Sequence, residues 1–190
     1  MILEVVKYGH PMLRQKGARV ETIDAEITQL IADMLETMHA AKGVGLAAQQ
    51  VGRALQLTVL DVRGATDRPS TFQRGGKEEE ANSVMPVILI NPEVKPIGES
   101  VAGPEGCLSF PEIFSDISRP AEAEVWAMNE KGEIIEFRCG GLLARAIQHE
   151  LDHLNGILFI DRMTRAEKEE LKPELEELQA LTKAALKNKK

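Results

Sequence analysis

The amino-acid sequence predicts an α+β fold in which antiparallel sheets surround a central helix with a His-Glu-x-x-His motif, and a further helix lies toward each end of the chain. The predicted elements follow the order helix, strands, hairpin, helix, helix, whereas a doubly wound sheet would alternate strands and helices. The 190 residues fit one domain, and 43% hydrophobic with 28% charged residues is typical of a soluble globular protein. We therefore expect residues 1–190 to form a single domain.

The first predicted element is an amphipathic helix from Asp24 to Ala41. Its apolar residues recur at steps of three and four. They are Ile27, Leu30, Ile31, Met34, Leu35 and Met38. Asp24 is a suitable N-cap and Gly43 a suitable stop. This pattern predicts an ordinary helix that packs its apolar face on the core.

Two strands are predicted on either side of a polar segment. Residues 55–62 are rich in Leu and Val, and residues 84–90 form a second apolar run in which Pro86 should lie at an edge or at the start. Residues 63–83 gather Gly, Ser and charged side chains. We expect this segment to be a mobile loop inserted into the domain.

A hairpin and the central helix follow. Apolar and polar residues alternate over 121–127, and a turn at 129–132 leads to a second short strand at 134–137. The next helix is predicted over 142–154, with Asn155-Gly156 as its stop.

The last segment, residues 164–190, is predicted to be a helix rich in Glu, Lys and Leu. Thr164 and Glu167 have the spacing of a capping box. Pro173 should interrupt the helix, because proline lacks a backbone donor and crowds the preceding turn.

Charge and cysteine content narrow the class of protein. The formal net charge of −7 is the wrong sign for a protein that coats nucleic acid. No apolar run approaches the length of a membrane helix, and the first residues do not form a secretory signal, so we expect no membrane association. Two cysteines, Cys107 and Cys139, are too few for a disulfide framework and favour a reducing cytoplasm.

The strongest chemical signal is His149, Glu150 and His153 on the predicted helix. Two histidines four residues apart project from one helix face, as two ligands of a tetrahedral metal site require. Glu150 lies beside them and can reach a water without being a ligand. Leu142 and Ala146 share this face, so the histidines have apolar neighbours, which favours a metal site over a pair of surface histidines.

A catalytic metal needs a third protein ligand. In the metzincin pattern the third histidine would stand at Phe159, which excludes that class. A gluzincin would use a later glutamate, and several are available. They are Glu167, Glu169, Glu170 and Glu174. Cys107, in an irregular Gly/Pro-rich segment between predicted strands, is another candidate, and the residues alone leave both open.

Three blocks of sequence together resemble the signature motifs of the peptide deformylase family. They are Gly43-Val-Gly-Leu-Ala-Ala-Gln-Gln50, Glu105-Gly-Cys-Leu-Ser109 and Gln148-His-Glu-Leu-Asp-His-Leu-Asn-Gly156. The resemblance spans Val5 to Arg162. The charged insertion at 63–83 departs from the family pattern and affects the expected shape of the outer rim.

The resemblance implies a catalytic domain that removes the formyl group from N-terminal formylmethionine of nascent peptides and releases formate. It implies Cys107, His149 and His153 as ligands of one divalent metal, and Glu150 as general acid/base. The metal expected from the family is Fe2+, although this ligand set also suits Zn2+, Ni2+ or Co2+.

The resemblance also assigns roles around the metal. The Gln50 side-chain amide and the Leu108 backbone N–H would stabilise the oxyanion. Gly45 and Leu46 would align the peptide through backbone hydrogen bonds. The methionine pocket would be walled by Leu142 and Ala146. The lysines of the C-terminal helix suggest docking on the ribosome. The alternatives are a gluzincin-like metallopeptidase and a catalytically silent peptide-binding module.

Overall fold

The computed structural model, which describes residues 1–189, confirms the α+β class. One sheet of seven strands, with every neighbouring pair antiparallel, has the order β1-β2-β5-β6-β7-β3-β4. The strands are β1 (Gly45–Ala47), β2 (Leu57–Leu60), β3 (Ser70–Arg74), β4 (Lys77–Glu79), β5 (Val87–Cys107), β6 (Phe110–Met128) and β7 (Ile134–Gly140). The α-helices are α1 (Ala25–Ala40), α2 (Gly141–Leu154), α3 (Arg165–Glu170) and α4 (Lys172–Asn188). Short 3-10 helices are η1 (Pro11–Arg14), η2 (Ala48–Val51), η3 (Ala81–Val84) and η4 (Phe159–Arg162).

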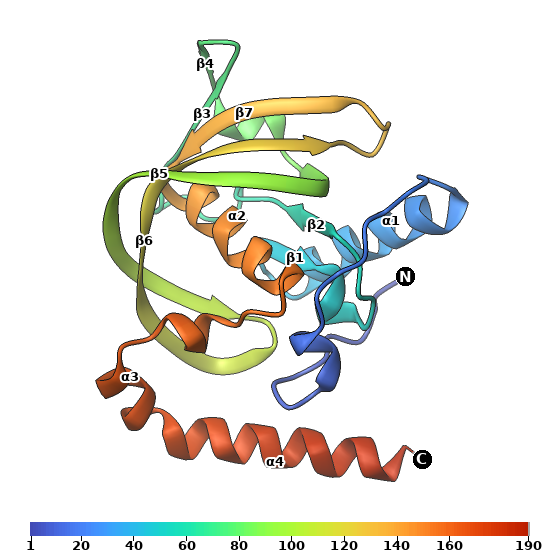
Figure 1. Ribbon diagram of the computed structural model, residues 1–190, viewed down its shortest axis with the longest axis vertical. Helices are drawn as coiled ribbons and strands as arrows, with labels where there is room; N and C mark the ends of the chain where they lie inside the picture. Colours follow the sequence, from blue (N-terminus) through green and yellow to red (C-terminus); the bar gives the residue numbers. More distant parts are fainter. Residues whose placement is uncertain (190) are drawn as a thin grey trace.

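Helix α2 lies in the middle of the molecule, surrounded by strands (Figure 1). Its apolar face packs in one core cluster with residues of β2, β3, β5, β6 and β7. Helix α1 packs in a second cluster against β1 and β2, and a third cluster joins η1, β6 and η4 to α4. The central position of α2 keeps its side chains away from water.

Both predicted helices before the C-terminal segment form close to their expected bounds. The Asp24 carboxylate caps α1 by accepting a hydrogen bond from the Ile27 N–H at 2.9 Å. Helix α2 starts at Gly141, whose φ of +66° suits glycine. A Cβ there would lie 2.2 Å from the Pro69 carbonyl oxygen, so a side chain at this position would displace the entry to the helix.

The prediction of an irregular segment around Cys107 is wrong, because the long strands β5 and β6 pair there. Residues 91–107 and 110–120 were not predicted as strands, because their glycines and prolines indicate loops. Strand β5 pairs with β2 only up to Ile90, and beyond it β6 is the single paired neighbour. A proline without an N–H is tolerated on such an unpaired edge. Cys107 therefore lies at the end of a long strand.

The segment 63–83 is also corrected, because it contains the β3–β4 hairpin in place of a structureless loop. Strand β3 pairs with β7, with Phe72 opposite Cys139. The Phe72 ring is buried and stacks on Phe137, with 4.8 Å between ring centroids. The local composition hides this strand, and the tertiary contact with β7 stabilises it.

The C-terminal segment forms two helices, as Pro173 predicted. Helix α3 begins with the capping box of Thr164 and Glu167. The helix is interrupted at Leu171, and Pro173 lies in the first turn of α4. The predicted end of the helix at Lys190 lies outside the described residues. No helix within residues 1–189 combines the length and apolar composition needed to cross a lipid bilayer.

Candidate active site

The fold brings Cys107, at the end of β5, against His149 and His153 of α2. Their candidate ligand atoms all lie within 4.8 Å of one another. Cys107 Sγ is 3.3 Å from His153 Nε2, and the two imidazole centroids are 5.0 Å apart. One thiolate and two imidazoles form a donor set that suits a transition metal or zinc and leaves a fourth position open. The residues present therefore fit a catalytic divalent metal.

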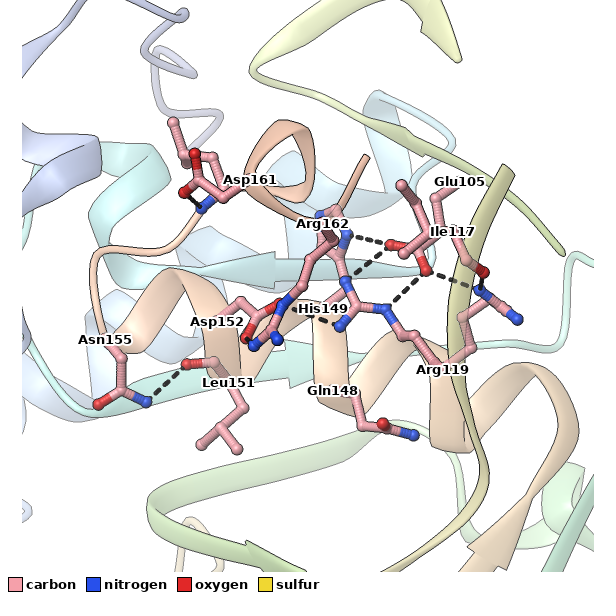
Figure 2. A network of polar contacts seen from close by, with 12 residues as sticks. Glu105, Ile117, Arg119, Gln148, His149, Leu151, Asp152, Asn155, Asp161 and Arg162 are labelled. Atoms are coloured by element: carbon pink, nitrogen blue, oxygen red, sulfur yellow. Dashed lines mark hydrogen bonds and ion pairs between the residues drawn. The ribbon is translucent and has the colours of Figure 1, made fainter. Parts of the chain in front are cut away.

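A buried ion-pair network orients His149 (Figure 2). His149 Nδ1 lies 2.9 Å from a carboxylate oxygen of Glu105, so Nδ1–H donates and Nε2 keeps its lone pair for a metal. Arg119 binds the same carboxylate through two donors, at 2.6 and 2.9 Å. Arg145 adds a third contact at 2.8 Å. Glu105 is thus fixed on both oxygens.

The network continues to the next turn of α2. Arg119 Nη1 donates to Asp152 at 2.9 Å, and Arg162 Nη2 donates to the other Asp152 oxygen at 2.8 Å (Figure 2). Glu105, Arg119 and Asp152 received no role in the sequence analysis. Glu105 and Asp152 stand inside the quoted motifs, but only the side-chain hydrogen bonds of the folded chain show that Arg119 lies between them.

Burial and hydrogen bonds together shift the pKa values of the central groups. The Glu150 carboxyl is buried, and this desolvation raises its pKa from 4.5 to about 7, which suits a group that must both accept and donate a proton near neutrality. Burial lowers the pKa of His153 well below 6.5. In His149 burial is outweighed by hydrogen bonds with Cys107 and Glu105, which raise the pKa.

Gln50 and Leu108, which the resemblance names as oxyanion donors, both lie near Cys107. The Gln50 side-chain oxygen Oε1 accepts from the Ala47 N–H at 2.9 Å, which leaves the side-chain nitrogen Nε2 3.4 Å from Cys107 Sγ. Leu108 follows Cys107 in the turn between β5 and β6. Its carbonyl accepts from Lys7 Nζ at 2.7 Å, so the peptide after Leu108 is also held.

A cavity of about 580 Å³ opens next to these groups, a volume ordinary for small-ligand sites. Its lining includes Gly45, Cys107, Leu142, Ala146 and Glu150. A Cβ on Gly45 would lie 2.5 Å from Glu150 Oε1, so this glycine makes room for the carboxylate. Eight predicted site residues, the candidate base among them, thus line one cavity: Gly45, Gln50, Cys107, Leu108, Leu142, Ala146, His149 and Glu150.

Comparison with known proteins agrees with this site. A family model described as polypeptide deformylase matches residues 2–169. The chain belongs to the peptide deformylase family. The peptide deformylase of Opitutus terrae is 43% identical over 189 residues and covers 98% of both chains. That of Methylacidiphilum infernorum is 44% identical over 178 residues, covering 94% of this chain and 93% of the relative.

Solved peptide deformylase structures share the fold. The Synechococcus elongatus enzyme in complex with actinonin has a TM-score of 0.77 and 40% identity, covering 90% of this chain and 85% of that one. The Legionella pneumophila enzyme has a TM-score of 0.80 and 31% identity, covering 95% and 97%. As a peptide deformylase, the chain is a hydrolase that removes the N-formyl group from nascent peptides, in a family whose members depend on a metal.

Leu46 lies apart from the other predicted site residues of this deformylase. Its side chain is fully buried and packs in the α1 cluster, away from the cavity. Only its backbone is available to a peptide. Because β1 is one of the two outer strands of the sheet and pairs with β2 on one side, its other side can accept an extended chain.

Proposed function

We propose that the chain hydrolyses the formyl amide of N-terminal formylmethionine on nascent peptides and releases formate. Cys107, His149 and His153 hold the metal, and Glu150 is the general acid/base. The observation that carries the proposal is the convergence of these three ligands beside a buried carboxylate with a pKa near neutrality. Cys139 has no part in the reaction, since burial raises the pKa of its thiol to about 12.

The residues divide the chemistry between them. A bound divalent metal supplies a Lewis acid and an activated water at neutral pH. Glu150 accepts the proton of the attacking water and later delivers it to the amine as the carbon–nitrogen bond breaks. Gln50 Nε2 and the Leu108 N–H donate to the oxygen that gains negative charge. The products are formate and a peptide with a free amino group.

Substrate alignment is assigned to the edge of β1 and to the cavity. The backbone of Gly45 and Leu46 hydrogen-bonds the peptide in an extended conformation. The methionine side chain enters the cavity between Leu142 and Ala146, which are 6% and 5% exposed and offer an apolar wall.

The proposal is tested by formate release from formyl-Met-Ala with protein purified without oxygen, together with analysis of the bound metal. We expect turnover, and Fe2+ as the native metal because the family commonly uses it; one thiolate and two imidazoles do not by themselves select Fe2+. Zn2+, Ni2+ or Co2+ can occupy the same ligands in purified protein. Protein with a full complement of metal and no formate release would contradict the proposal.

Cys107→Ser distinguishes the proposed Cys107, His149 and His153 metal site from that of a gluzincin-like metallopeptidase. Replacing a thiolate ligand with a hydroxyl should weaken metal binding by more than the roughly 10- to 100-fold typical of losing an outer-shell partner, measured by competition with a chelator. A site built from the two histidines and a later glutamate would keep its affinity. The glutamate ligand is already disfavoured at Glu167, whose carboxylate caps Thr164. Cys139→Ser is the matched control and should bind metal normally.

We also propose that α4 docks on the ribosome through its exposed end. Lys183 and Lys187 are exposed there, whereas the exposed Lys189 pairs with Glu4 at 2.9 Å. Clustered lysines suit the phosphate surface of RNA. Deleting residues 181–190 should lower co-sedimentation with ribosomes, and unchanged co-sedimentation would contradict docking.

Two further proposals concern the chain as a whole. We propose a cytoplasmic location, because a Cys107 ligand requires a reduced thiol. We also propose that residues 1–190 act as one catalytic domain, which the single continuous sheet supports.

A further inference from the structure

Two positive side chains at the opening of the cavity have no acidic partner. Lys42 and Arg68 both line the cavity, Lys42 exposed and Arg68 half-buried. Neither forms a salt bridge within residues 1–189, whereas Arg63 nearby binds Asp61 at 2.5 Å. Their charges are therefore available to a ligand.

The pairing of β1 with β2 places both cations on one side of the opening. Gly45 lies opposite Leu60, so the residues before β1 and those after β2 leave the same end of the strand pair. The Asp61 N–H donates to the Val44 carbonyl at 2.9 Å and extends this pairing. Lys42 comes shortly before Val44 in the sequence and Arg68 comes after Asp61, so both residues belong to segments that leave this end of the strand pair.

The backbone at Lys42 supports a role for its side chain. Lys42 follows the C-cap of α1 with a φ of +56°, where glycine is usual. A residue with a Cβ is strained in this conformation, and such strain concentrates at functional sites. At this position the conformation places Lys42, with its ammonium group, in the lining of the cavity.

The other charged groups of the cavity do not neutralise this side. Arg145 is paired with the buried Glu105 at 2.8 Å, and Lys7 donates to a backbone carbonyl. Glu150 is buried beside the metal ligands. The exposed Glu112 belongs to β6, the neighbour of the strand that carries Cys107. The β1–β2 side of the opening is thus positive.

We propose that Lys42 and Arg68 select formylated peptides with an acidic side chain at the second or third residue. This inference rests on the proposed function, in which methionine fills the cavity and the following residues pass through its opening. In an extended peptide they lie roughly 3 to 7 Å further along the chain. A carboxylate there meets two cations, and a lysine meets repulsion.

The test compares kcat/KM for formyl-Met-Ala-Glu-amide and formyl-Met-Ala-Lys-amide, and for the pair with Glu or Lys at the second residue. The amide removes the terminal carboxylate. We expect a preference of about tenfold for Glu in at least one pair at low salt, because each exposed charge contact changes the rate a few-fold. The preference should shrink in roughly 0.5 M salt. Ratios near one in both pairs would overturn the proposal.

Charge variants locate the effect. Lys42→Gln with Arg68→Gln should bring the Glu-to-Lys ratio close to one, and Glu112→Gln should increase it. Lys77→Gln, which removes one positive charge on β4 outside the cavity, should leave the ratio as it is. A preference that persists in the double variant, or that changes equally in Lys77→Gln, would contradict the assignment to Lys42 and Arg68.

A binding measurement separates this inference from the proposed function. In metal-loaded Glu150→Gln the affinities of the two peptides can be measured by calorimetry without turnover. Absent turnover in the unaltered chain contradicts the proposed function, whereas equal affinities for the Glu and Lys peptides contradict the selection of acidic substrates.

Discussion

Glu150→Gln is expected to lower kcat for formate release by about a thousandfold, within the range for loss of a general acid/base. The amide keeps the size of the side chain but cannot accept the proton of the attacking water. The native carboxyl is suited to this task, because burial raises its pKa to about 7 and one of its oxygens, Oε2, has no hydrogen-bond partner within residues 1–189. Single-turnover kinetics on metal-loaded protein would measure the loss.

Metal content and a second variant make this result interpretable. Glu150→Gln should keep its metal, since the three ligands remain. Gln50→Ala, which removes one proposed oxyanion donor, should lower kcat by about a hundredfold with the base intact. Full activity in Glu150→Gln would rule out Glu150 as the general acid/base and leave the metal site untouched.

Sequence patterns predicted those parts of the fold whose signals are local. The period of apolar residues and the capping residues located α1 and α2, and Pro173 located the break before α4. The spacing of His149 and His153 on a helix predicted two ligands on one face. These features depend on residues within one or two helical turns of each other.

Features that depend on pairing between distant strands were missed. Strand β5 contains Pro96 and Pro104, and prolines in a sequence indicate a loop. They are compatible with a strand here because β5 beyond Ile90 pairs with β6 on one side and leaves its other edge unpaired. The role of Arg119 follows from its position between Glu105 and Asp152, on two other elements. Arg68 lies in a segment predicted to be a mobile loop. No local sequence pattern could place the β5–β6 pair, Arg119 and Arg68 around helix α2.

Arg119→Met should lower the free energy of unfolding by about 3 kcal/mol, because it removes one cation from two buried carboxylates. Arg119 and Glu105 are 5% and 4% exposed in their side chains, and Arg119 also binds Asp152. The loss stays at the lower end of the range for broken buried pairs because Arg145 and Arg162 still contact the two carboxylates. Urea unfolding monitored by circular dichroism would measure it.

Arg138→Met is the matched control for that stability measurement. Arg138 pairs with Glu122, but both side chains are substantially exposed, 47% and 38%. Loss of such a surface pair should cost less than about 1 kcal/mol. Equal losses in the two variants would show that burial of the Arg119 network contributes nothing particular to stability.

The pH dependence of unfolding gives an independent measure of the same network. Burial raises the pKa of Glu105, but hydrogen bonds from His149 and Arg119 outweigh it and lower the pKa from 4.5 to about 2. The stabilisation from this carboxylate is therefore present above pH 4.5 and is lost as the pH falls toward 2. Arg119→Met raises this pKa, so acid unfolding should begin at a higher pH, by about one unit. An unchanged acid midpoint would mean that Arg119 does not hold Glu105 in its charged form.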